Sequence, residues 1–314
     1  MKAVRYHKFG STDVLKIEEV SDLNINDDEI LVEVYSTIVN AGDCHLRGGN
    51  PFLARLFAGP ITPRNKILGS SFSGKVVAIG NTVKKYKVGD EIMGSLGINT
   101  GSHAQFLKVN EKDIVIKKPT TLTHEEAVSL VFGSLSAKYF LDKANLTEGQ
   151  DVLIIGASGG VGSYAVQYAT ALGAKVIGVC SESGRDFVLS LGAKETIDYK
   201  TTQLKDFGQK FDLILDTAGR EKKTVLDSLL KESGTYVTTV MKVEILMAQL
   251  FSKKKKYIFD IDKATSGDLE IIMDLVLEGN YRPLIDTIYK MDDIKLAYEH
   301  VEEKSRTGAI VINI

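Results

Sequence analysis

Apolar residues change their spacing near residue 122. Before this point they occur in short runs rich in Val, Ile and Tyr, such as "EILVEVYSTIV" (29–39) and "GKVVAIG" (74–80), bounded by Gly, Asn and Asp. Such runs are typical of β-strands. Beyond it, short and nearly continuous apolar runs alternate with segments of helical period. The pattern predicts a β-rich part, followed by an α/β part whose parallel sheet is covered on both faces.

The alternation of apolar runs and helical segments divides the α/β part into individual strands and helices. Helical spacing over 160–172 places Val161, Tyr164, Ala165 and Tyr168 on one face. Strands are expected at 151–156, 174–180, 195–199, 211–219, 234–240 and 256–261, with a further helix at 184–192. Thr123 and Glu126 have the spacing of a capping box, so a helix is expected to begin there.

Two segments are less clear. The stretch 45–67, "HLRGGNPFLARLFAGPITPRNKI", has no strong period and holds three of the five prolines, so we expect a long loop. After a helix at 268–279 come "RPLIDTIYKM" (282–291), expected to be a second helix, and a closing strand at 308–314. The period alone leaves open whether this tail extends the parallel sheet or returns to the β-rich part.

Composition excludes several classes of function. The 314 residues are 44% hydrophobic and 25% charged, with a net charge of −2, which favours no polyanionic partner. The basic run 253–256 is followed by aspartates, and we interpret it as a solvated strand entrance rather than a nucleic-acid or lipid patch. The stretch between Asp151 and Lys175 lacks formal charge but contains two glycine clusters, so no membrane span is expected. Two cysteines and an N-terminus without an apolar run favour the cytoplasm.

The glycine-rich turn is the main chemical signal. Gly156, Gly159, Gly160 and Gly162 follow a G-x-x-G-G-x-G spacing where a strand ends and a helix begins. Backbone without Cβ atoms can turn tightly there and approach a ligand. The helix N-terminus adds unpaired N–H groups and a positive dipole end, which favour a pyrophosphate. The spacing differs from G-x-G-x-x-G, but its context predicts a dinucleotide-binding turn; the alternative is a tight turn without a ligand.

The end of the second predicted strand discriminates between cofactors. Sites for NAD usually place Asp or Glu there, on the ribose 2′-hydroxyl. Here the strand ends at Cys180 and Ser181, while Glu182 comes late and Arg185 follows. This arrangement predicts NADPH, because a guanidinium pairs well with a 2′-phosphate. Tyr199 is expected beside the same adenosine. The alternatives are a solvated arginine and a strand-end aromatic residue.

With these motifs in place, the chain resembles the zinc-independent quinone oxidoreductases of the medium-chain dehydrogenase/reductase superfamily. The resemblance runs nearly end to end. It rests on "MKAVRYHKFG" (1–10), "NAGD" (40–43), "ILGSSFSGKVVAIGNTVKKYKVGDEIMG" (67–94), "GASGGVG" (156–162), "THEEAVSLVFGSLSAKYFL" (123–141) and "RTGAIVINI" (306–314). No single motif is decisive, but their order and spacing are highly specific.

This resemblance implies an α/β fold in which a doubly wound Rossmann domain interrupts a β-rich, GroES-like catalytic domain. The catalytic domain would span residues 1–122 and 267–314, and the NADPH-binding Rossmann domain 123–266. A homodimer is also implied. The residues predicted to contact the cofactor are Gly156, Ala157, Ser158, Gly159, Gly160, Val161, Gly162, Ser181, Arg185, Tyr199, Ala218 and Arg306.

The chain departs from its zinc-dependent relatives at the metal ligands. Asn40 stands where they have a cysteine, and Ser70 and Ser71 replace their His-Glu pair. Ser71 also replaces the aspartate of zinc-free relatives. Cys44 and His45 are adjacent, but a tetrahedral site needs three converging protein ligands and no third candidate is evident. The sequence therefore predicts no metal.

The reaction implied is hydride transfer to a quinone or an α,β-unsaturated carbonyl. Negative charge then develops on oxygen, which needs a donor. The stretch 45–67 has no tyrosine, so Asn40, a backbone N–H, the cofactor ribose or water remain as donors. Asn40 and Asp43 are the predicted catalytic positions; the alternative is a satisfied turn. Other possible functions are a regulatory or structural module that binds NADPH without catalysis, and a zinc-dependent alcohol dehydrogenase.

Overall fold

The computed structural model describes residues 1–50, 55, 58–302 and 306–314. These residues form two compact units, each assembled from separate segments of the chain. The first unit comprises Met1–Phe132, Thr265–Met273 and Pro283–Ile314, and the second comprises Gly133–Ala264 and Asp274–Arg282. The boundaries predicted at 122/123 and 266/267 stay a prediction, because helices α3 (His124–Lys143) and α8 (Ser266–Leu277) each run from one unit into the other.

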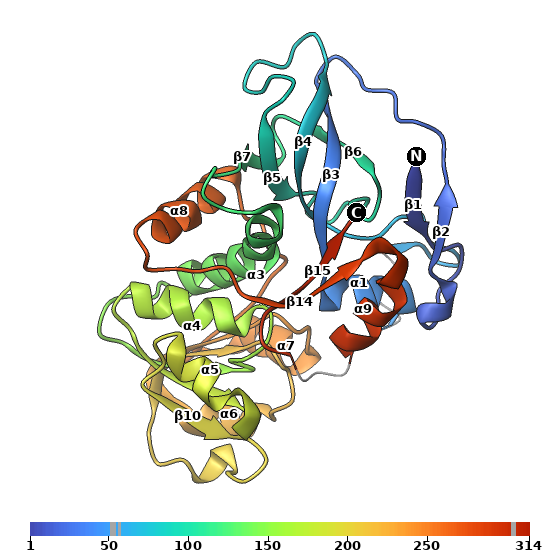
Figure 1. Ribbon diagram of the computed structural model, residues 1–314. Coiled ribbons are helices and arrows are strands. Elements are labelled where there is room, and N and C mark those ends of the chain that lie inside the picture. The colour runs from blue at the N-terminus through green and yellow to red at the C-terminus, as the bar shows by residue number, and fades with distance from the viewer. Residues whose placement is uncertain (51–54, 56–57, 303–305) are drawn as a thin grey trace. The chain divides into compact units, whose positions relative to one another are not determined.

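The second unit is built on a six-stranded parallel sheet, whose edge strand β10 (Glu195–Asp198) is labelled in Figure 1. Its strands are β8 (Asp151–Ile155), β9 (Lys175–Cys180), β10 (Glu195–Asp198), β11 (Phe211–Asp216), β12 (Leu230–Thr238) and β13 (Lys256–Phe259). The spatial order is β10-β9-β8-β11-β12-β13, and every pair is parallel. This is the doubly wound order of dinucleotide-binding sheets. The Rossmann prediction is therefore confirmed.

The composition of the central strand explains this architecture. Val152, Leu153 and Ile154 are successive and all fully buried, so both faces of β8 are covered. The helices of this unit that follow α3 in the chain are α4 (Gly162–Ala171), α5 (Arg185–Ser190), α6 (Lys223–Leu229) and α7 (Val243–Phe251), with the short 3-10 helices η2 (Glu182–Gly184) and η3 (Leu204–Asp206). They follow the alternation that the sequence predicts.

The first unit contains a mostly antiparallel sheet of seven strands and a separate two-stranded pair. In the larger sheet β14-β15-β3-β4-β5-β7 lie in that order, and β6 also pairs with β3. The strands are β1 (Lys2–Arg5), β2 (Lys16–Glu19), β3 (Glu29–Val39), β4 (Ser71–Ile79), β5 (Glu91–Ser95), β6 (Phe106–Asn110), β7 (Ile114–Lys117), β14 (Ile285–Lys290) and β15 (Ala309–Asn313). Buried positions alternate over the first part of β3, as expected for a strand with one covered face, whereas its last four residues, 36–39, are all buried.

The C-terminal tail returns to this first unit. Strand β15 pairs antiparallel with β3, placing Val311 opposite Ile38. The second helix predicted at 282–291 is wrong, because this segment contains β14, which pairs parallel with β15 and places Ile288 opposite Val311. The helix of the tail is instead α9 (Ile294–Glu302). Short 3-10 helices η1 (Thr12–Val14) and η4 (Met291–Asp293) complete the unit. The structure thus decides the question that the period left open.

The predicted long loop is wrong at its start. Residues 45–48 belong to helix α1 (Ala41–Gly48), which ends at Gly49 in a left-handed conformation with φ 63°. The helix forms because Asn40 and Asp43 make a capping box at its N-terminus, a signal that we did not use for this segment. The parts of the predicted loop at 51–54 and 56–57 lie outside the described residues.

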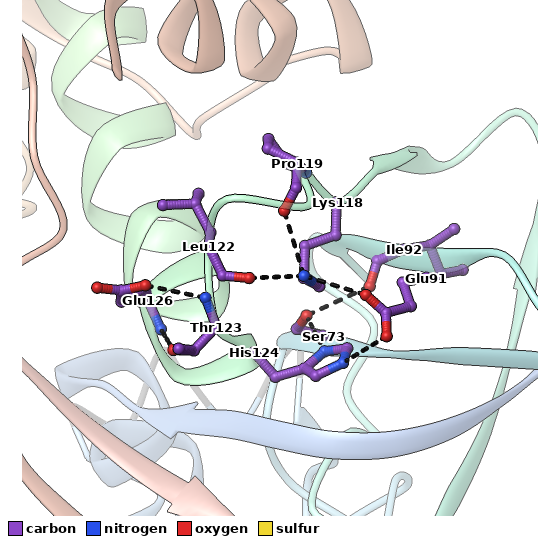
Figure 2. Close-up of polar contacts among 9 residues, drawn as sticks. All are labelled: Ser73, Glu91, Ile92, Lys118, Pro119, Leu122, Thr123, His124 and Glu126. Atoms are coloured by element: carbon purple, nitrogen blue, oxygen red, sulfur yellow. Dashed lines mark hydrogen bonds and ion pairs between the residues drawn. The ribbon is translucent and has the colours of Figure 1, made fainter. Parts of the chain in front are cut away.

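The capping box predicted for α3 is confirmed. The Thr123 N–H donates to Glu126 Oε2 at 2.9 Å, and the Glu126 N–H donates to Thr123 Oγ1 at 3.2 Å (Figure 2). The buried ammonium of Lys118 fixes the approach to this helix. It donates to the Leu122 carbonyl at 2.6 Å and lies 3.1 Å from Glu91 Oε2 (Figure 2).

The structure also bears on membrane spans and on the two cysteines. Within the described ranges, none of the helices combines the length and the hydropathy needed to cross a bilayer. Cys44 and Cys180 are both free thiols.

Candidate active site and cofactor-binding site

The glycine turn between β8 and α4 is a close-packed piece of backbone. Gly156 has a φ of 84°, and a Cβ there would lie 2.5 Å from Thr217 Oγ1. A Cβ on Gly162 would lie 2.1 Å from the Gly156 carbonyl oxygen. Both distances are far below contact, so these two glycines are required by the fold of the turn itself.

Gly160 has a different environment. A Cβ there would meet nothing within 4 Å, and one on Gly159 would meet only the Gly156 carbonyl oxygen, at 3.3 Å. This side of the turn therefore faces open space. Val161, just before α4, gives no side-chain cap, and the first turn of α4 has no acidic residue. The positive end of the helix is left for an external anion, and the diphosphate of a dinucleotide fits this cradle.

The end of β9 lies beside this turn, because the Gly156 and Ala157 N–H groups both donate to the Val179 carbonyl at 3.0 Å. The Tyr199 N–H donates to the Cys180 carbonyl at 3.3 Å, which ties the loop after β10 to the end of β9. The Ser181 and Ser183 hydroxyls lie 2.9 Å apart. Arg185 Nη1 lies 3.8 Å from Glu182 Oε1, and both side chains are exposed.

A buried carboxylate shapes the loop after β11. Asp216 Oδ1 accepts the N–H groups of Ala218 at 3.0 Å and Gly219 at 2.7 Å. Its Oδ2 accepts the Tyr236 hydroxyl at 2.9 Å. Burial and this carboxylate raise the pKa of Tyr236 far above its usual range, so the phenol stays a donor. Sequence reasoning missed Asp216, although an aspartate after an apolar strand and before Thr-Ala-Gly is a typical turn signal.

The two predicted catalytic positions lie together in the first unit. The Asn40 N–H donates to Asp43 Oδ2 at 3.0 Å, and the Asp43 N–H donates to Asn40 Oδ1 at 3.1 Å. Asp43 Oδ1 accepts the Gly69 N–H at 3.1 Å. The Asn40 amide also donates to Ser70 Oγ at 3.4 Å. Asp43 is therefore held by peptide donors on both oxygens, and it orients Asn40.

Burial changes the acidity of this carboxyl group. Asp43 is almost fully buried, and desolvation raises its pKa to about 7, although its peptide donors act in the opposite direction. The neighbouring Ser71 hydroxyl is buried without a hydrogen-bond partner among the described residues. Polar side chains thus gather around the end of β3 and the start of β4.

The remaining predicted contact is Arg306, also in the first unit. Its Nη1 donates to the Val301 carbonyl at 2.7 Å, and burial lowers its pKa. Gly156 to Gly162, Ser181, Arg185, Tyr199 and Ala218 belong to the second unit. The cofactor and catalytic roles of all these residues stay predictions. Across the described chain, the structure offers no group of three His, Cys, Asp or Glu side chains that could hold a metal ion.

Comparisons with known proteins agree with this architecture. Residues 26–120 match the family described as "Alcohol dehydrogenase GroES-like domain", and residues 191–312 match "Zinc-binding dehydrogenase". The chain is 30% identical to "2-methylene-furan-3-one reductase" of Solanum lycopersicum, over 100% of this chain and 79% of that protein. It is 32% identical to "NAD(P)H oxidoreductase RTN4IP1, mitochondrial" of Homo sapiens, over 98% and 87%.

A solved structure extends the comparison to the fold. The quinone oxidoreductase of Coxiella burnetii superposes with a TM-score of 0.91 at 26% identity, covering 100% of this chain and 99% of that one. The similarity includes both units and the order of their segments. The chain is therefore an oxidoreductase of the medium-chain dehydrogenase/reductase superfamily and belongs to its zinc-independent quinone oxidoreductase family.

Proposed function

We propose that this protein is an NADPH-dependent reductase that delivers hydride to a quinone or an α,β-unsaturated carbonyl without zinc. An oxidoreductase of this family uses a nicotinamide cofactor. The observation that carries the proposal is the glycine turn, because Gly160 faces open space in front of an uncapped helix N-terminus. The names of the relatives, a methylene-furanone reductase and an NAD(P)H oxidoreductase, support the same chemistry.

The residues of the second unit would bind the nucleotide. Peptide groups from Gly156 to Gly162 would hold its diphosphate, and Ser181, Tyr199 and Ala218 would contact its adenosine half. When bound, the reduced nicotinamide supplies the hydride. NADPH is preferred over NADH in this proposal because β9 ends in uncharged residues, Cys180 and Ser181, without a carboxylate at the strand end.

The first unit would manage the charge that develops on the substrate oxygen. The Asn40 amide has two N–H groups, and one of them donates to Ser70 Oγ. The second can donate to an oxyanion, because the capping box with Asp43 holds the Asn40 backbone in place. Asp43 is thus a positioning residue, and Asn40 is the proposed donor.

The experiment that tests this proposal measures binding and turnover together. NADPH and NADH are titrated by calorimetry, and oxidation of the reduced nicotinamide is then followed with quinones and with short and long enones. We expect tight NADPH binding and turnover, and an Asn40→Ala variant should lose kcat while keeping NADPH affinity. Binding without turnover on any acceptor would instead favour a non-catalytic module. Absence of binding would contradict the interpretation of the glycine turn.

We also propose that the protein is a homodimer assembled through β13. This strand lies at the edge of the described sheet, so one side of its backbone is unpaired. The adjacent helix α7 exposes Val243, Met247, Leu250 and Phe251, which share one helical face. Analytical ultracentrifugation should show a dimer, and a Leu250→Glu/Phe251→Glu variant should sediment as a monomer. A wild-type monomer would contradict the proposal.

The remaining expectations concern location and partners. We propose a cytoplasmic protein, since Cys44 and Cys180 form no disulfide. We also propose that it acts on small molecules and not on polyanions, since the basic run 253–256 is partly paired: the Lys254 ammonium lies 3.4 Å from the Glu232 carboxylate. Some relatives are named as mitochondrial or chloroplastic. Cell fractionation with an antibody to the native protein tests the location, and enrichment in an organelle fraction would contradict it.

A further inference from the structure

Arg220 is an exposed arginine in the loop that follows β11, and the sequence did not point to it. Its guanidinium carbon lies 5.8 Å from the centroid of the Tyr199 ring, within the range of a cation–π contact. The Tyr199 N–H is bonded to the Cys180 carbonyl at the end of β9. Loops after three different strands therefore converge where a Rossmann sheet recognises the adenosine ribose.

The arginine that the sequence favoured is less suited to bind a phosphate. Arg185 lies 3.8 Å from Glu182. Both residues line a pocket of about 220 Å³ together with Glu195 and Asp198. The three carboxylates that line this pocket with Arg185 oppose the approach of an anion. Among the ion pairs of the described residues none involves Arg220, so its charge is available to a ligand.

The backbone that carries Arg220 is fixed in advance. The buried Asp216 accepts the N–H groups of Ala218 and Gly219, the two residues that precede Arg220. Gly219 has a φ of 65°, and a Cβ there would lie 2.8 Å from Val240 Cγ1. The loop therefore leaves the sheet in a defined direction, and a ligand that binds Arg220 does not have to order this turn.

We propose that Arg220 recognises the 2′-phosphate of NADPH, with its guanidinium lying on the Tyr199 ring and the Ser181 and Ser183 hydroxyls completing the site. A guanidinium stacked on an aromatic face keeps its N–H edge free for a bidentate phosphate contact. The two hydroxyls, 2.9 Å apart, offer further donors at the end of β9. This inference rests on the proposed NADPH dependence. It names Arg220 as the residue that would make the protein prefer NADPH over NADH.

Binding of fragments without a nicotinamide tests the proposal independently of turnover. Calorimetry measures 2′,5′-ADP and 5′-AMP, followed by NADPH and NADH, on wild type, on Arg220→Gln and on Arg185→Gln, which tests the competing arginine. We expect Arg220→Gln to weaken 2′,5′-ADP and NADPH binding by about 10- to 100-fold, the range for a lost charge-assisted contact. Binding of 5′-AMP and NADH should stay within about twofold. Arg185→Gln should have little effect on any of the four ligands.

Several outcomes would overturn this assignment. Equal losses for 2′,5′-ADP and 5′-AMP in Arg220→Gln would mean that the arginine contacts a group that both ligands carry, and not the 2′-phosphate. A larger loss in Arg185→Gln would give the phosphate to that residue. A wild type that prefers 2′,5′-ADP but is unaffected by Arg220→Gln would refute the inference and leave NADPH dependence intact. A wild type that binds both fragments equally would refute the NADPH preference, and one that binds neither would refute the nucleotide site.

Discussion

The contrast between Gly160 and Gly162 gives a test of the binding site that needs no substrate. Both residues lie in one turn, but they are glycines for different reasons. A Cβ on Gly162 would lie 2.1 Å from the Gly156 carbonyl oxygen and 2.8 Å from its carbon, so the backbone would have to move. A Cβ on Gly160 would meet nothing within 4 Å. Alanine at the two positions should therefore separate the stability of the turn from its function.

The structure sets the expected magnitudes. Gly162→Ala should lower the free energy of unfolding by about 3 kcal/mol, the upper range for overpacking a tight site. Gly160 is not among the glycines with positive φ, so Gly160→Ala should leave stability unchanged or raise it by about 0.5 kcal/mol. The added methyl group would occupy space that the diphosphate needs. NADPH affinity should fall at least about tenfold, or ~1.4 kcal/mol.

Urea unfolding followed by circular dichroism measures the stability, and calorimetry measures NADPH binding. Gly208→Ala is the matched control, because a Cβ there also meets nothing within 4 Å and the residue lies in the exposed loop between η3 and β11. This variant should change neither quantity. Wild-type NADPH affinity in Gly160→Ala would refute the assignment of the open side of the turn to the cofactor. Wild-type stability in Gly162→Ala would refute the packing argument.

Three further predictions concern buried polar groups. Asp216→Ala should lower the free energy of unfolding by about 4 kcal/mol in urea, because two peptide N–H groups and the Tyr236 hydroxyl lose their acceptor; a loss below about 1 kcal/mol would contradict it. Lys118→Met should cost about 2 kcal/mol in the same assay, because the Leu122 carbonyl loses a buried donor; an unchanged urea midpoint would contradict it. Burial lowers the pKa of His103 from 6.5 to about 4, so between these pH values the unfolded chain binds a proton that the folded chain does not. Wild type should lose up to about 3 kcal/mol as pH falls through this window, whereas His103→Gln should lose less; parallel curves would refute the linkage.

Much of the fold could be predicted because local patterns and tertiary packing agree. The nearly continuous apolar run of β8 requires two covered faces, and the Val-, Ile- and Tyr-rich run of β3 is typical of a strand. The capping box of Thr123 and Glu126 is a purely local signal, and it was found. The helical start of the predicted loop has an equally local signal, the capping box of Asn40 and Asp43, but these two residues also belong to the "NAGD" motif that carries the family resemblance.

The candidate site was harder to predict, because its geometry depends on loops far apart in the sequence. Tyr199 and Arg220 are 21 positions apart and follow different strands, so no spacing rule links them. Their contact depends on a strand order that places β9 beside β10 and β8 beside β11. The sequence predicts Arg185 as the contact of the 2′-phosphate because this residue is near the end of β9 in sequence. Glu182 is nearer still to the end of β9, and it pairs with Arg185.

Each unit uses a buried aspartate to fix the backbone beside a candidate functional residue. Asp43 accepts the N–H groups of Asn40 and Gly69, and Asp216 accepts those of Ala218 and Gly219. Burying a carboxylate is costly, and several peptide donors offset that cost while fixing the turn from more than one direction. For Asp43 the compensation is incomplete, since its pKa rises to about 7. Below that pH the Asp43 carboxyl is protonated and accepts fewer hydrogen bonds from the peptide groups that it holds. The orientation of the Asn40 amide, the proposed donor, therefore depends on pH, although Asp43 itself donates nothing to the substrate.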